Sequence, residues 1–250
     1  MVVCIAGRLP LPAMVLLMLS SCAAPIHAPV QQQAEDHEEG DQTRPDVLSP
    51  TRARDTAPLQ LSLDRHIQLI DLERSISGLR FGLLVSENRT VDGFDLNLGG
   101  GTSHGGNGIQ ISLVGNGVHN HYNGIQLAGL TNWMHGHVDT AGFQGALLLN
   151  RQPYGQAAGL KTAFMNQHGT QIGAQIGVFN GANDSRGVQV GMLNLAGVTN
   201  RGLQIAVGNW TEANPGVQIG IANRAKGGLQ IGLLNFNVNG FLPVFPIFNF

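Results

Sequence analysis

Residues 187–194 read GVQVGMLN, residues 216–223 read GVQIGIAN and residues 228–235 read GLQIGLLN. Each segment begins with a glycine and then alternates apolar and polar residues, which is the period of two of a β-strand. Similar segments begin 12 to 18 residues apart at Gly78, Gly93, Gly108, Gly124, Gly142, Gly159, Gly173, Gly187, Gly202, Gly216 and Gly228, and a divergent twelfth, FLPVFPIFNF, ends the chain. The sequence therefore predicts an all-β repeat protein.

The segments between the copies are short and polar, as at residues 182–185 and 224–227, and such segments are typical of hairpin turns. About twelve strands joined by hairpins predict an antiparallel meander, and closure into a β-barrel would remove its exposed edges. A β-solenoid and a soluble curved sheet are the alternatives. The solenoid is less favoured because each copy supplies one apolar strand, whereas an apolar solenoid interior needs apolar residues on at least two walls.

The two faces of the predicted strands differ in character. One face is aliphatic and aromatic, and the other carries mainly glutamine. If the apolar face contacts lipid, the polar face lines a lumen, as in outer-membrane barrels. The residues of this polar face are candidates for contact with a solute or ligand: Arg80, Asp95, Gln110, Gln126, Gln144, Lys161, Gln175, Gln189, Gln204, Gln218 and Gln230.

The N-terminal segment is typical of an exported protein. Residues 1–21 combine Arg8 with a short apolar stretch and predict a signal peptide. The next segment, residues 22–58, is acidic and rich in proline, which predicts a disordered tether. Residues 59–77 form either an edge strand or a short helix, with a strand favoured at residues 59–63, and the repeat β domain spans residues 78–250.

The sequence LSSC at residues 19–22 resembles the lipobox of bacterial lipoproteins. This resemblance implies cleavage before Cys22 and acylation of that cysteine, with palmitate among the attached groups. Ala23 follows the cysteine in place of the aspartate that tends to retain lipoproteins in the inner membrane, so the resemblance implies the outer membrane. Membrane lipid is thus the expected partner, through acylated Cys22 and through the exterior of the barrel.

The repeats carry a second resemblance. The GxQxGxxN copies, GLRFGLLVSENRTVDGFDLNLG at residues 78–99 and the terminal FLPVFPIFNF together resemble a group of bacterial surface-repeat lipoproteins. The resemblance covers roughly residues 75–250 and implies a location in the cell envelope. It implies no activity and no catalytic residues.

The charge and the motifs of the sequence limit the classes of function that we expect. With 14 basic and 16 acidic residues the net charge is −2, so the basic surface of a nucleic-acid-binding protein is not expected. Four histidines, His104, His135, His137 and His168, are placed to converge at one rim of a meander, and imidazole is a common metal ligand; the alternative is that they are ordinary polar turn residues. The chain contains no recognisable catalytic motif, so we expect neither an enzyme nor a cofactor.

These observations predict an outer-membrane lipoprotein with a structural or surface role. The alternative is a lipid-tethered β module that binds a glycan, a protein or a metal, with the ligand unidentified.

Overall fold

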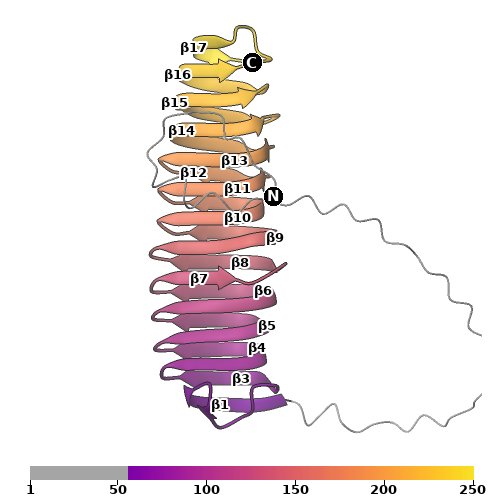
Figure 1. Cartoon of the computed structure of the whole chain (residues 1–250), viewed down its shortest axis with the longest axis vertical. Helices are drawn as coiled ribbons and strands as arrows, with labels where there is room; N and C mark the ends of the chain where they lie inside the picture. The colour runs from indigo at the N-terminus through magenta and orange to yellow at the C-terminus, as the bar shows by residue number, and fades with distance from the viewer. Residues whose placement is uncertain (1–55) are drawn as a thin grey trace, which may run out of the picture. The chain divides into compact units, whose positions relative to one another are not determined.

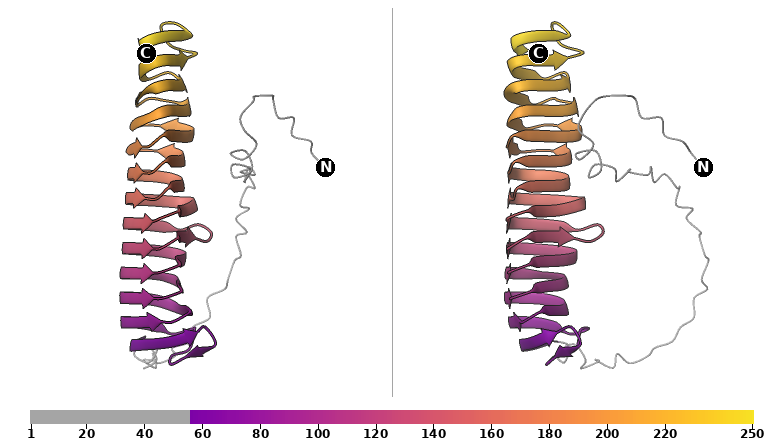
Figure 2. Two further views of the ribbon diagram at one scale, coloured as in Figure 1. Left: turned by 90° about the vertical axis from the view of Figure 1, so that its left-hand side faces the viewer. Right: turned by 60° about the vertical axis from the view of Figure 1, so that its left-hand side comes forward.

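A computed structural model describes residues 56–250; the predicted signal peptide, Cys22 and nearly all of the predicted tether lie outside the described residues. The described part is all-β, and its seventeen strands form one continuous sheet. The sheet winds into a β-solenoid, a stack of coils that rises from β1 to β17 (Figures 1 and 2).

The strands follow one another with short connections. Their bounds are β1 (Thr56–Asp64), β2 (Ile67–Gln68), β3 (Ser75–Gly82), β4 (Val85–Asn97), β5 (Gly100–Ser112), β6 (Gly115–Ala128), β7 (Thr131–Met134), β8 (Asp139–Ala146), β9 (Leu149–Thr162), β10 (Met165–Ile176), β11 (Phe179–Ser185), β12 (Val188–Val190), β13 (Leu193–Asn200), β14 (Leu203–Ala213), β15 (Val217–Lys226), β16 (Leu229–Asn237) and β17 (Val244–Asn249).

Equivalent positions of successive copies lie directly above one another. Gly93 of β4 pairs with Gly108 of β5, which pairs with Gly124 of β6, and the strands are parallel. Within residues 56–250, only the pairs β1–β2 and β16–β17, at the two ends of the stack, are antiparallel. The predicted antiparallel meander and β-barrel are therefore wrong, and the solenoid alternative is confirmed.

Each coil has two walls and two edges, and the coil that starts at Gly108 illustrates them. Residues 108–112 form wall A, residues 113–114 turn the chain at the apolar edge, and residues 115–118 form wall B. Residues 119–123 then bend the chain at the charged edge, where wall A of the next coil begins with Gly124. Gly124 has φ +136°, and a Cβ there would lie 2.0 Å from the carbonyl oxygen of Gly108, so this position requires glycine.

The argument against a solenoid assumed that its interior is apolar, and the interior is polar. The side chains that point inward are mainly glutamine and asparagine, whereas buried apolar residues are few and gather in small clusters such as Val118, Tyr122, Met134 and Val138. Amide side chains can fill a narrow coil because each one pairs with the amide of the next coil. A single apolar face per copy is then sufficient, and that face lies outside.

Candidate functional site

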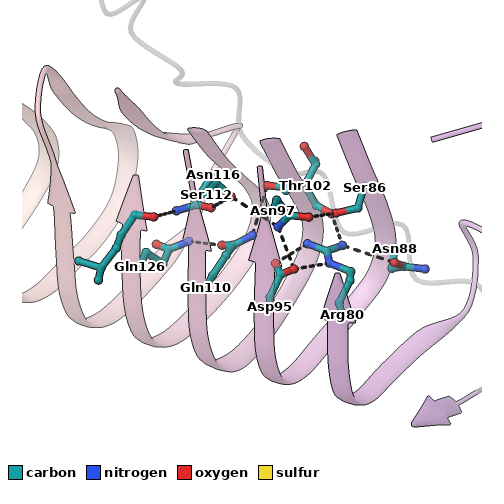
Figure 3. A network of polar contacts seen from close by, with 12 residues as sticks. Arg80, Ser86, Asn88, Asp95, Asn97, Thr102, Gln110, Ser112, Asn116 and Gln126 are labelled. Carbon is teal, nitrogen blue, oxygen red and sulfur yellow. Dashed lines mark hydrogen bonds and ion pairs between the residues drawn. The ribbon is translucent and has the colours of Figure 1, made fainter. Parts of the chain in front are cut away.

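The predicted polar-face residues all point into the solenoid rather than toward a lumen. None of them is more than 2% exposed: Arg80, Asp95, Gln110, Gln126, Gln144, Lys161, Gln175, Gln189, Gln204, Gln218 and Gln230. Figure 3 shows the first coils of this interior, with Gln110 and Gln126 side by side on successive coils. A solute could reach these groups only if the coils separated.

The glutamines of wall A form a hydrogen-bonded ladder along the axis. Nε2 of Gln126 donates to Oε1 of Gln110 at 2.9 Å, and Nε2 of Gln144 donates to Oε1 of Gln126 at 2.6 Å. The same bond recurs from Gln189 to Gln230 at 2.7 to 3.0 Å. Each glutamine of the ladder therefore donates toward the N-terminal end.

An asparagine ladder runs in the opposite sense beside the apolar edge. Nδ2 of each asparagine donates to Oδ1 of the next coil's asparagine at 2.8 to 3.1 Å, from Asn116 through Asn132, Asn150, Asn166, Asn180, Asn194, Asn209 and Asn223 to Asn235. Nδ2 also reaches a backbone carbonyl near the turn, as from Asn166 to Ile176 at 3.0 Å. The asparagine side chains inside the coil thus stabilise the turns.

Charged residues interrupt the glutamine ladder at its start. Arg80 and Asp95 form a buried bidentate ion pair, with Nε to Oδ1 at 2.7 Å and Nη2 to Oδ2 at 2.6 Å (Figure 3). Nη1 of Arg80 also donates to the carbonyl of Thr102 at 2.9 Å, and Nδ2 of Asn97 donates to Oδ1 of Asp95 at 2.8 Å. These bonds satisfy both charges inside the coil, which is what burial of an ion pair requires.

Lys161 is a second place where an ionisable residue interrupts the glutamine ladder. Unlike Arg80, it forms no ion pair there with a carboxylate of residues 56–250. Its Nζ lies 3.2 Å from Oγ1 of Thr140, and burial lowers the pKa of Lys161 to about 7. Oε1 of Gln144, which would accept from a glutamine at this position, has no hydrogen-bond partner. On the next coil Nε2 of Gln175 donates to Nδ1 of His168 at 2.6 Å, and burial, together with Lys161, lowers the pKa of His168 to about 3.

The four candidate metal ligands are not brought together. His168 is buried inside, whereas His104 and His135 lie on the outer surface in one column, separated by His119, with ring centroids 5.1 and 4.8 Å apart. The stacked rings do not converge on a common point, and His137 instead lies in an isolated bridge with Tyr154. Among residues 56–250, no group of three or more His, Cys, Asp or Glu side chains is arranged to hold a metal ion.

The outer surface is apolar along wall A. Its outward side chains, such as Leu79, Ile125 and Ile231, remain 40 to 45% exposed. The apolar edge continues this surface around the turn with large exposed side chains: Leu83, Leu84, Leu98, Leu113, Val114, Leu130, Leu147, Leu148, Phe164, Met192, Val207, Ile221 and Leu233. In residues 78–234, the ionisable side chains of wall A all point inward, and the apolar edge has none.

Ionisable side chains gather instead at the opposite edge and on the adjoining part of wall B. They include Arg89, Asp92, His104, His119, His121, His135, His137, Asp139, Arg151, Asp184, Arg186, Arg201, Glu212, Arg224 and Lys226. The guanidinium groups of Arg151 and Arg224 lie 4.5 and 4.1 Å from the ring centroids of Trp133 and Trp210. Each coil is therefore amphipathic, with an apolar edge on one side and a charged edge on the other.

The apolar surface is hollowed at the N-terminal end. A groove of about 690 Å³ lies there between β1, β2 and the first coils, and its lining includes Leu61, Ile67, Leu69, Phe81 and Leu98. Because Phe81 belongs to wall A and Leu98 to the apolar edge, the groove is continuous with both.

Sequence reasoning missed the apolar edge. The signal was present in pairs such as Leu113–Val114 and Leu147–Leu148, which end their strand patterns without the glycine, asparagine or proline that ordinarily marks a turn. The alternating pattern runs through these residues, so the sequence predicts that they belong to the strands.

Comparison with known proteins adds no relative. No family model, no curated protein and no solved structure matches the chain. Within residues 56–250, no helix is long and apolar enough to cross a membrane.

Proposed function

We propose that the chain is an acylated lipoprotein of the bacterial outer membrane, and that its solenoid serves as a structural element at the membrane surface. The observation that carries the proposal is the apolar outer surface of wall A and the apolar edge, on which no ionisable side chain lies in residues 78–234. From Gly78 to Gly228 it spans ten coil steps, or about 48 Å at roughly 4.8 Å per strand. Contiguous apolar surfaces of this kind mark contacts with protein or membrane.

A structural role fits the geometry better than a binding role for the glutamine face. The amides that a ligand would need are buried and already bonded to one another, as between Gln126 and Gln110. A stack of similar coils held by repeated bonds is extended, and each coil depends on its neighbours. The predicted acylation at Cys22 would keep such a rod at the membrane through residues 23–55.

The test is metabolic labelling with palmitate followed by separation of inner and outer membranes. The natural chain is expected to incorporate label and to sediment with the outer membrane. Cys22→Ser, exported with a non-lipoprotein signal peptide, is expected to incorporate none. A natural chain without label, or one recovered with the inner membrane, would contradict the proposal.

A further inference from the structure

In residues 78–234, the three most exposed apolar side chains lie in one row along the apolar edge. Leu113, Leu147 and Leu233 are 66%, 71% and 67% exposed, and the outward residues of wall A are less so. Leucine at a solvent-exposed turn gains nothing from burial within its own coil, yet large apolar residues recur at this turn from Leu83 to Leu233. The row is therefore arranged to be covered by something outside the solenoid.

Much of the backbone at this edge is hydrogen-bonded within the solenoid. At several turns an N–H bonds to a carbonyl of the coil before it: Leu130 to Val114 at 2.9 Å, Leu148 to Leu130 at 3.0 Å and Phe164 to Leu147 at 3.1 Å. From inside, the asparagine ladder bonds carbonyls near the turns, as Asn132 does to Gly145 at 3.0 Å. Such pairing lowers the cost of placing the edge among lipid tails, where an unpaired peptide group costs several kcal/mol.

The distribution of charge indicates which side of the coil would face the membrane and which would face water. The charged edge lies across the coil, so the apolar row can be submerged while residues such as Arg186, Glu212 and Lys226 stay in water. Peripheral proteins lie in the membrane interface in this way, with an apolar face buried about 5–10 Å into the headgroup and acyl boundary.

The shape of the edge favours lipid over a second copy of the chain. The row follows the outside of a turn, so it is convex in section and extends onto wall A on one side. Two convex ridges meet along a line and leave their flanks uncovered. A fluid acyl layer can cover the ridge and its flank together.

We propose that the apolar edge inserts into one leaflet of the membrane, so that the solenoid lies with its long axis in the membrane plane. This inference rests on the proposed function, because it places the chain at a membrane, and it adds a second point of contact that does not depend on the acyl group. The partner is the hydrocarbon of the lipids, so binding does not require a particular headgroup.

The test uses the unacylated chain Cys22→Ser, exported with a cleavable non-lipoprotein signal peptide and mixed with vesicles of phosphatidylethanolamine and phosphatidylglycerol. We expect it to float with the vesicles in a density gradient, and to do so equally at high salt. The double substitution Leu113→Asp and Leu147→Asp should weaken partitioning at least about 100-fold, because two buried leucines are lost. Val198→Asp is the matched control, since Val198 is 57% exposed on the charged side of its coil, and it should float like its parent.

The depth of insertion is measured with a dye attached to a single introduced cysteine. This is possible because the exported Cys22→Ser chain contains no other cysteine. An environment-sensitive dye at Leu147→Cys should shift to the blue on adding vesicles, and brominated acyl chains should quench it. The same dye at Val198→Cys should do neither. Circular dichroism and amide hydrogen exchange confirm that each variant keeps the solenoid.

Two results would overturn the inference. One is a folded Cys22→Ser chain that stays in solution, or that floats equally well with the two aspartates. The other is a dimer in solution that the aspartates dissociate while no variant binds vesicles, which would assign the edge to a second copy. Palmitate labelling of the natural chain does not depend on either result. A failure of the edge to insert can therefore be distinguished from a failure of the lipoprotein proposal.

Discussion

Replacing one buried lysine, Lys161→Gln, is expected to stabilise the solenoid. Lys161 occupies the ladder position that glutamine holds in the coils on either side, at Gln144 and Gln175. Burial lowers its pKa from 10.5 to about 7. Because the folded-state pKa lies below the unfolded value, the unfolded chain binds more protons between pH 7 and 10.5, and the stability of the natural chain rises with pH across that window.

The size of the gain depends on pH. The pKa difference corresponds to at most about 5 kcal/mol, at 1.36 kcal/mol per pKa unit, and this penalty is full below pH 7 and absent above pH 10.5. Glutamine would also donate to Oε1 of Gln144, which has no partner, for about 1 kcal/mol more. We expect Lys161→Gln to raise the free energy of unfolding by about 3–5 kcal/mol at pH 6 and by about 1 kcal/mol at pH 11.

The assay is urea unfolding at pH 6, 8 and 11, together with amide hydrogen exchange in β9 and β10, because coils can open locally. Lys226→Gln is the control: its Nζ lies 3.4 Å from Glu212 in an exposed pair, so the change should be within about 0.5 kcal/mol. A Lys161→Gln chain that is no more stable than the natural one at pH 6, or whose gain is independent of pH, would refute the reasoning.

Three other substitutions probe the coil. Gly124→Ala, whose Cβ would lie 2.0 Å from the carbonyl oxygen of Gly108, should lower the free energy of unfolding by about 3 kcal/mol or more; an unchanged urea midpoint would contradict this. Asn166→Ala leaves ladder and turn groups unpaired and should cost about 3–5 kcal/mol, with faster exchange in the adjoining coils. Arg80→Met should cost about 3–5 kcal/mol in urea unfolding by leaving Asp95 buried and unpaired, and adding Asp95→Leu should recover much of it.

The sequence was sufficient for the repeat, but not for the way its copies pair. Alternation at Val217, Gln218 and Ile219 separates two faces without saying which of them is inside. Interpreting the polar bends as hairpins predicts antiparallel pairing, because several of the second bends, such as Leu113–Val114 and Leu147–Leu148, contain no turn residue and do not stand out as bends. What the pattern predicts as one strand and a loop is therefore a coil with two walls.

The candidate site depended on register, which a single copy does not reveal. His104, His119 and His135 occur at different spacings along the chain, and only the coil register places them in one column. His168 lies in the column that points inward, so it could not join them. If the glycines that begin wall A, such as Gly108 and Gly124, are aligned directly above one another, the histidines fall into the correct columns. That alignment, however, presupposes the solenoid.

The polar interior and the apolar exterior of each coil are linked through the stability of the fold. A coil filled by Gln126 and Asn132 and their equivalents gains little from burying hydrocarbon, so its stability depends on amide bonds that are each worth only about 1 kcal/mol net. Those bonds strengthen where the local dielectric is low, because water competes less for the same donors and acceptors. Insertion of the apolar edge would exclude water from the side of the coil where the asparagine ladder runs. Covering residues such as Leu147 would then stabilise the ladder behind them, so membrane contact and the stability of the fold would rise together.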